Sequence, residues 1–166
     1  MKGEKKLVAT LCAAGVLAAS GVFAAPSKAK DVTVTILRVA QVDNLDKGDA
    51  LGKDDADFYV QIWINGKLWR SENMSKDDGR PNWTFSVPAS KRNVPIRIKL
   101  IDDDGGLEEQ DDFVDINRRG GKKDLNLTLN TRNGRITGDV SGRRGKVLRS
   151  WGGGDTDKAQ IWLMIH

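Results

Sequence analysis

The sequence has one cysteine and one histidine in 166 residues. Cys12 lies in the apolar N-terminal stretch, and His166 is the last residue. The rest of the chain therefore has no residue for disulfides, thiolate catalysis or thiolate metal sites. A terminal histidine is too weakly tethered to act as a general base. These absences exclude chemistry based on sulfur or imidazole, including zinc and other transition-metal sites that need clusters of such ligands.

The sequence also has no convincing segment of helical period and lacks the short motifs of ester and nucleotide chemistry. No G-x-S-x-G nucleophile elbow occurs, and Gly145-Lys146 has neither the upstream glycine nor the following hydroxyl residue of a P-loop. Paired carboxylates could in principle support glycoside hydrolysis. Acids crowded on the loops of a small domain are more naturally a cation site. We therefore expect a protein that is not an enzyme.

The N-terminal segment has the layout of a secretory signal peptide. A basic start, "MKGEKK", precedes an uncharged Ala-rich run and the small-residue exit "VFAAPS". We expect cleavage after Ala24, so that residues 1–24 are the signal peptide, residues 25–30 a short linker and residues 31–166 one domain. The expected location is secreted, or in the periplasm or cell envelope. The apolar run approaches the ~20 residues that span a bilayer, so a retained membrane anchor is the alternative.

From Asp31 onward, apolar and polar residues alternate with a period of two, which is typical of half-buried strands. The alternation is clearest in "VTVTILRVA", "FYVQIWI", "IRIKL", "LNLTLN" and "AQIWLMI". The pairs Asn65-Gly66 and Asn133-Gly134 indicate tight hairpin turns, because both central residues of such a turn need positive φ. About eight short strands predict an all-β fold, an antiparallel eight-stranded β-sandwich. We expect Trp83 in its core and Trp151 at its surface.

Two segments between the expected strands are rich in carboxylates. Residues 101–116 hold eight acidic residues and no lysine or arginine, and residues 43–57 hold six Asp and two Lys. Such blocks of like charge are ordinarily exposed segments whose charges are solvated by water. If both loops emerge at one end of a sandwich, however, their carboxylates converge and can supply the six to eight oxygen ligands of Ca²⁺. Neither segment has the spacing of an EF-hand.

The stretch from residue 117 to residue 149 is basic, with ten Lys+Arg and two Asp. Such a stretch can bind nucleic acid or another anionic surface. No aromatic RNA-binding signature or zinc-finger spacing accompanies it, so we expect solvated strand and turn residues and no nucleic-acid partner.

Three segments, taken in order, resemble the C2 domain, a Ca²⁺-dependent β-sandwich best known for docking to membranes. "NLDKGDALGKDDADFYVQI" is similar to the first calcium loop of that family, "RPNWTFSV" to its Asn-Pro-x-Trp segment, and "LIDDDGGLEEQDDFVDI" to its third calcium loop. The resemblance covers roughly residues 31–130. It implies a C2-like fold in a secreted variant of bacterial type.

The resemblance also implies a set of Ca²⁺ ligands in these two loops: Asp49, Asp57, Asp102, Asp104 and Asp112. Both loops are longer than the family pattern, so four other acids compete for these places: Asp46, Asp54, Asp55 and Asp111. Leu51 and Leu107 stand where the membrane-inserting loop tips of the family would be. Arg97 and Lys99 alternate outward on one strand and could form an accessory patch for anionic lipid.

Together these features predict a secreted, non-catalytic, calcium-binding module that attaches to anionic phospholipid membranes. The alternative is a calcium-stabilised extracellular or envelope module that binds a protein or an anionic polysaccharide and has no affinity for lipid.

Overall fold

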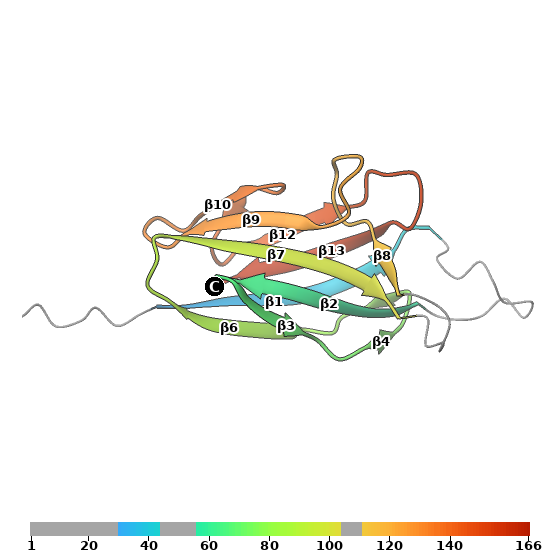
Figure 1. Cartoon of the computed structure of the whole chain (residues 1–166), viewed down its shortest axis with the longest axis horizontal. Coiled ribbons are helices and arrows are strands. Elements are labelled where there is room, and N and C mark those ends of the chain that lie inside the picture. Colours follow the sequence, from blue (N-terminus) through green and yellow to red (C-terminus); the bar gives the residue numbers. More distant parts are fainter. Residues whose placement is uncertain (1–29, 44–55, 104–110) are drawn as a thin grey trace, which may run out of the picture.

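The protein was analysed as a computed structural model, which describes residues 30–43, 56–103 and 111–166. The predicted signal peptide lies outside these ranges. The described residues form thirteen strands and no helix, in two antiparallel sheets that pack as a sandwich (Figure 1). Within them, no helix has the length and hydropathy needed to span a membrane. The predicted all-β sandwich is confirmed.

The smaller sheet, sheet A, has the strand order β12-β13-β1-β5, and β6 also pairs with β1. Its strands are β1 (Lys30–Gln41), β5 (Asp78–Gly79), β6 (Trp83–Ala89), β12 (Val147–Trp151) and β13 (Ala159–Ile165). Sheet A therefore joins the first and the last strand of the described residues.

The larger sheet, sheet B, has the order β11-β10-β9-β7-β2-β3, with β4 paired to β2 and β8 paired to β7. Its strands are β2 (Asp57–Ile64), β3 (Lys67–Arg70), β4 (Met74–Ser75), β7 (Asn93–Asp102), β8 (Asp112–Val114), β9 (Leu125–Asn130), β10 (Arg135–Gly138) and β11 (Gly142–Arg143). The strand count exceeds the predicted eight because several strands of two to four residues are too short to show an alternating pattern.

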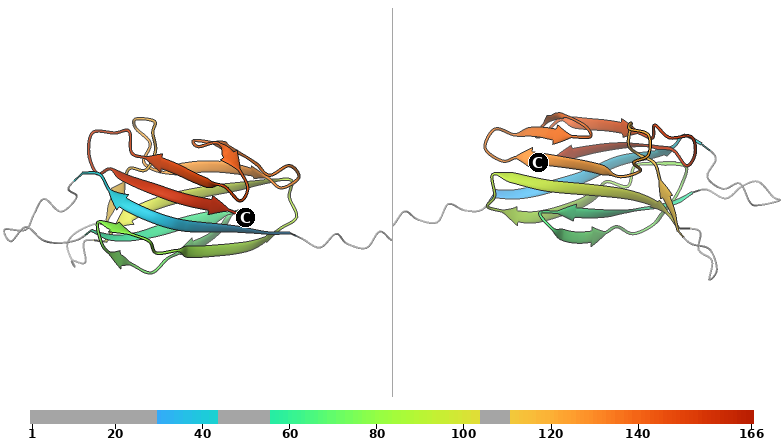
Figure 2. Two further views of the ribbon diagram at one scale, coloured as in Figure 1. Left: turned by 180° about the vertical axis from the view of Figure 1, so that it is seen from behind. Right: turned by 45° about the horizontal axis from the view of Figure 1, so that its top comes forward.

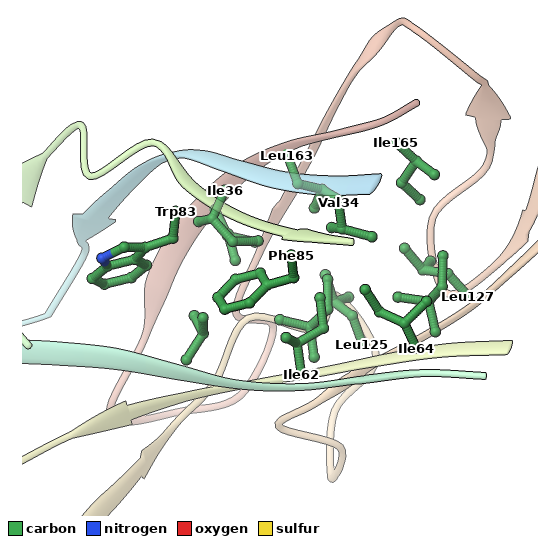
Figure 3. Packing of buried hydrophobic residues seen from close by; sticks show 14 of the residues in the cluster. Val34, Ile36, Ile62, Ile64, Trp83, Phe85, Leu125, Leu127, Leu163 and Ile165 are labelled. Atoms are coloured by element: carbon green, nitrogen blue, oxygen red, sulfur yellow. The ribbon is translucent and has the colours of Figure 1, made fainter. Parts of the chain in front are cut away.

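The core lies between the sheets and is formed by the alternate side chains that point inward. Strand β6 buries every second residue from Trp83 to Ala89, and β13 does the same from Ala159 to Ile165. Figure 3 shows side chains of sheet A facing side chains of sheet B across this layer: Val34, Ile36, Trp83, Phe85, Leu163 and Ile165 against Ile62, Ile64, Leu125 and Leu127. The predicted burial of Trp83 is confirmed, while Trp151 is 39% exposed.

The two predicted hairpin turns differ. Asn65 and Gly66 both have positive φ and join Ile64 of β2 to Lys67 of β3, as expected for a two-residue turn. Between β9 and β10 the connection is four residues long, and of the pair Asn133-Gly134 only Gly134 has positive φ. The second prediction was therefore wrong in its turn type. The cause is that the Asn130 carbonyl oxygen closes a longer loop by accepting from the Gly134 N–H.

The described residues that border the two acidic segments lie at one end of the sandwich (Figure 1). The last residues of β7 pair with the first residues of β2, so that Asp102 lies opposite Phe58. On sheet A, the Val42 N–H donates to the Lys158 carbonyl, next to the start of β13. This end, called the acidic end below, is the place where the sequence predicts a cation site.

Candidate functional site

Asp57 and Asp102 are brought together by the pairing of the strands they belong to. Asp57 begins β2 and Asp102 ends β7. The backbone N–H of Asp57 donates to Oδ1 of Asp102 over 2.7 Å, and the N–H of Asp103 donates to the carbonyl oxygen of Asp57 over 3.0 Å. Asp102 is buried, with only 2% of its surface exposed. One predicted ligand from each acidic loop thus lies at the same edge of sheet B.

Asp57 has a carboxylate oxygen in an unfavourable position. Its Oδ1 atom is buried and accepts no hydrogen bond from the described part of the chain. A buried acceptor without a donor costs about 1–3 kcal/mol, and more when it is charged. A bound cation would remove that cost, because carboxylate oxygen is the donor type that Ca²⁺ prefers.

Asp112 extends this pair along sheet B. It begins β8 and lies directly opposite Asp102 in the β7–β8 register, with its side chain exposed. Three of the five predicted ligands therefore lie on neighbouring strand ends. In residues 30–43, 56–103 and 111–166, however, no three acidic side chains are grouped closely enough to hold a metal ion by themselves.

The remaining predicted site residues lie outside the described residues. These are the ligands Asp49 and Asp104, the competing acids Asp46, Asp54 and Asp55, and the loop-tip residues Leu51 and Leu107.

Asp111, a competing ligand in the sequence, is bound to the only tyrosine of the chain. The Tyr59 hydroxyl donates to Oδ2 of Asp111 over 2.6 Å, and the Arg70 guanidinium carbon lies 3.9 Å from the centroid of the Tyr59 ring. Burial raises the pKa of Tyr59 to about 12, and the hydrogen bond to Asp111 adds to the rise. The sequence pattern did not indicate this pair, because it joins residues 52 positions apart.

Protein donors hold three further acids of the acidic end. Asp103 accepts from Nδ2 of Asn73 over 2.5 Å and forms an ion pair with Arg70 at 3.4 Å. Asp77 accepts the backbone N–H of Ala56 over 3.1 Å, immediately before β2. On the other side of the first acidic segment, Asp43 forms an ion pair with Lys158 at 3.3 Å. These contacts hold in place the described residues that adjoin the two acidic segments.

A shallow basic groove of about 210 Å³ lies next to the acidic end on sheet B. Arg97, Lys99 and Lys123 line it together with Phe113, which is 48% exposed. Arg97 forms an ion pair with Asp124, and the Lys99 Nζ lies 4.4 Å from the centroid of the Phe113 ring. Asp112 and Phe113 are neighbours in β8, so one short strand borders both the acidic end and the groove.

Asp155 and Asp157 belong to the turn before β13. Asp157 has a positive φ of 53° and forms an ion pair with Lys123 at 3.0 Å. Its carbonyl oxygen accepts the N–H of Asp115. Asp157 therefore acts as a structural residue of this turn.

No protein-family model matches the chain, and no curated protein matches it in sequence. Solved structures match it in fold. A C2 domain structure covers 81% of this chain and 96% of its own length, with a TM-score of 0.51 and 12% identity. A calcium-bound structure of the two C2 domains of extended synaptotagmin 2 covers 84% of this chain, with a TM-score of 0.50 and 14% identity, and 46% of that protein is matched.

Human GIVD cytosolic phospholipase A2 also matches, over 81% of this chain at 16% identity and a TM-score of 0.47. The present chain spans only 16% of the length of that protein. The two matches with a TM-score of 0.50 or more establish the arrangement of the strands, and they confirm the predicted C2 fold.

Proposed function

We propose that this chain, which has the fold of a C2 domain, is an exported, non-catalytic module that binds Ca²⁺ at its acidic end and then attaches to anionic membrane lipid. The observation that carries the proposal is the buried Oδ1 atom of Asp57, which has no hydrogen-bond partner in the described residues. It belongs to the residue whose backbone N–H donates to the Asp102 carboxylate. That arrangement is costly for the protein alone and favourable around a cation.

The residues that would hold Ca²⁺ are Asp57, Asp102 and Asp112 from the strand ends, with Asp49 and Asp104 from the acidic segments. Carboxylates fit Ca²⁺ because it is a hard cation that takes six to eight oxygen ligands. The bound ion would supply positive charge to a region that is otherwise strongly negative, and that charge would attract a phosphate group. Asp111 competes for a place in this set, and its Oδ1 atom would be the ligand because Oδ2 accepts the hydrogen bond from Tyr59.

Lipid attachment is supported by the basic groove beside the acidic end. Lys99 adds positive charge, whereas Lys123 is already ion-paired with Asp157. The exposed ring of Phe113 adds an apolar contact next to Asp112. Near an anionic bilayer, each lysine or arginine contributes about 1 kcal/mol. An ion held at the acidic end and cations in the groove would therefore face the same headgroup region.

Export is proposed from the N-terminal segment, with cleavage after Ala24 and a final location outside the cell or in its envelope. Extracellular calcium modules operate with dissociation constants of ~10⁻⁴–10⁻³ M. We therefore expect an affinity in that range, in which Ca²⁺ is permanently bound where the ion is abundant.

The experiment that tests the proposal is flotation of the full chain with vesicles of phosphatidylcholine and phosphatidylserine, in millimolar Ca²⁺ and in chelator. We expect flotation in Ca²⁺ only, and its loss in Asp57→Asn. Asp31→Asn is the matched control, because Asp31 is an exposed acid at the opposite end of β1. Flotation that is equal in Ca²⁺ and chelator would contradict the proposed mechanism, since it would point to the apolar N-terminal segment instead.

A further inference from the structure

The outer face of sheet A carries a row of cations and aromatic rings. Arg149 of β12, Trp162 of β13 and Arg38 of β1 lie directly opposite one another in the strand register. The guanidinium carbon lies 4.4 Å from the Trp162 ring centroid for Arg38 and 5.0 Å for Arg149. Figure 2 shows the three strands side by side on the rear of the sandwich.

A β-bulge places the arginine in this row. The register of β1 against β13 shifts between Ile36, which pairs with Leu163, and Arg38, which pairs with Trp162. Without the extra residue, Leu37 would lie opposite Trp162. Bulges commonly redirect a side chain in this way. The chain thus interrupts a regular strand pairing and presents a guanidinium, in place of a leucine, to the indole ring.

The row continues at the end of β12. Trp151 is exposed, and the Arg118 guanidinium carbon lies 3.4 Å from its ring centroid. Arg118 is held there by the glycine run that follows Trp151: the Gly153 N–H donates to the Asn117 carbonyl, and a Cβ on Gly152 would lie only 2.5 Å from the Asp115 carbonyl oxygen. Only glycine permits this close approach. The tryptophan and the arginine are therefore pre-arranged as a pair.

On the other side of the row, the surface is hollowed between β1 and β5. A depression of about 500 Å³ is lined by Arg38, Lys76 and Arg80, with Asp78 and Pro81. Neighbouring strands lie about 4.8 Å apart, so the surface from β5 to β12 extends over roughly 14 Å. We name its five central residues the Arg–Trp strip: Arg38, Arg118, Arg149, Trp151 and Trp162.

The strip carries positive charge that the described protein does not neutralise. The positive charge of Arg38 is balanced by Asp78, which accepts two hydrogen bonds from the guanidinium. This contact lowers the pKa of Asp78. Arg149 donates to the neutral amide of Gln160 over 2.6 Å, and Arg118 donates to the Arg149 carbonyl. No carboxylate of the described residues lies within ion-pair distance of Arg118 or Arg149. Their charge is available to an anionic partner.

We propose that the Arg–Trp strip binds an acidic polysaccharide, a sugar chain that carries carboxylate groups. Guanidinium groups form two parallel hydrogen bonds with a carboxylate, and the apolar face of a sugar ring packs on an exposed indole such as Trp151. The surface from β5 to β12 that contains the strip extends over roughly 14 Å and suits a polymer better than a single small anion. This surface is on the opposite sheet from the basic groove and contains none of the proposed calcium ligands.

A single-stranded nucleic acid is less favoured by the same geometry. Such strands bind by stacking successive bases on successive aromatic faces. Here the Trp162 ring already has a guanidinium of Arg38 and one of Arg149 beside it. Trp151 has Arg118 on its ring at 3.4 Å and Arg149 at 5.8 Å, yet the residue is still 39% exposed, so the strip offers one partly open ring among several cations. That arrangement suits a chain that needs one apolar contact and several charge contacts.

The test is calorimetric titration of the full chain with polygalacturonate in chelator, so that Ca²⁺ plays no part. We expect saturable binding that weakens with added salt. Arg118→Gln combined with Arg149→Gln should weaken it by about tenfold or more, since each lost charge-assisted contact is one of the stronger kinds of hydrogen bond. Trp151→Ala should weaken it as well, and Trp151→Phe should retain most of the affinity.

Arg135→Gln combined with Arg143→Gln is the matched control. This pair is also exposed and lies in register on β10 and β11 of sheet B, so it removes the same charge from the other sheet. We expect it to leave the affinity nearly unchanged. Equal losses in both double variants, or no binding at all, would overturn the proposal. Tighter binding of oligodeoxythymidylate or of phosphatidylserine vesicles, lost in the same strip variants, would also overturn it and assign the strip to that partner.

Discussion

The backbone N–H of Asp57 donates a hydrogen bond to the carboxylate of Asp102 over 2.7 Å, which ties the start of β2 to the end of β7. Asp102 is therefore an acceptor that the fold uses, as well as a proposed ligand. Because it is buried, its loss affects the apo sandwich and not only the binding of a cation. The two roles can be separated by the choice of substitution.

Asp102→Ala should lower the free energy of unfolding by about 1–3 kcal/mol in chelator, because it leaves the Asp57 N–H without its acceptor. Asp102→Asn should cost less, since the amide oxygen can still accept that hydrogen bond. Urea unfolding followed by circular dichroism measures both values. Equal losses in the two variants would show that charge, and not the hydrogen bond, is the contribution that matters.

Asp57→Asn should change stability in opposite directions with and without calcium. In chelator the substitution removes the charge of a carboxylate that has one buried, unpaired oxygen, so the melting temperature should stay the same or rise. In Ca²⁺ at about 100 times the dissociation constant, the wild-type chain should gain about 2.7 kcal/mol from binding, and the variant should lose most of that gain. Thermal melts in both conditions give the comparison. A wild-type melting temperature that Ca²⁺ leaves unchanged would contradict the calcium site.

Lys99→Gln should weaken Ca²⁺-dependent attachment to phosphatidylserine vesicles by about fivefold, which corresponds to the ~1 kcal/mol that one lysine contributes near an anionic membrane. Lys91→Gln is the control, because Lys91 is exposed in the turn before β7, at the end of the strand opposite Asp102. Cosedimentation over a range of lipid concentrations measures both affinities. The same loss in both variants would assign the effect to net charge alone.

Gly152→Ala should destabilise the protein by about 1–3 kcal/mol, because the added methyl group would meet the Asp115 carbonyl oxygen at 2.5 Å. Gly120→Ala is the control, since a Cβ at Gly120 meets nothing within 4 Å. We expect that change to stay within about 0.5 kcal/mol. Unfolding in urea tests the pair, and equal stability of the two variants would show that the glycine run does not pack as closely as described. Gly152→Ala should also weaken polygalacturonate binding, because it disturbs the segment that holds Arg118 beside Trp151.

The β-sandwich was predictable because the sequence patterns that indicate its strands and turns are local. Alternation in β6 and β13 marks the buried face directly, and Asn65-Gly66 indicates its hairpin by the backbone angles that those two residues tolerate. Strands β4 and β5 gave no such signal, since two residues cannot alternate. The bulge at Leu37 was also not foreseen, because it depends on how β1 meets β13, more than a hundred residues later.

The candidate site was predictable only in its location. Carboxylate density predicted a cation site in two loops, and the pairing of β2 with β7 explains why Asp57 and Asp102 lie together. The hydrogen bond from Tyr59 to Asp111 and the Arg–Trp strip join residues that are distant in sequence. Side-chain packing creates such contacts, and composition alone does not indicate them. The basic stretch at 117–149 was expected to be merely solvated, yet two of its arginines are stacked on tryptophan rings.

Tyr59 allows a direct test of the acidic end, because it is the only tyrosine and its ionisation can be followed by ultraviolet absorbance. Burial, together with the hydrogen bond to Asp111, raises its pKa to about 12 from the ordinary value of 10.0. The folded state thus holds the phenol proton more tightly than the unfolded state. Its contribution to stability is complete below pH 10 and is lost as the pH rises toward 12.

Asp111→Asn should lower the pKa of Tyr59 without returning it to 10.0, because burial is the larger cause and remains in place. If Asp111 is a Ca²⁺ ligand, adding Ca²⁺ to the wild-type chain should also lower the pKa of Tyr59, since a cation held on that carboxylate favours the charged phenolate. Circular dichroism at each pH must show that the chain is still folded. A wild-type titration near the ordinary pKa of 10.0 in folded protein would mean that Tyr59 is neither buried nor hydrogen-bonded to Asp111 as described.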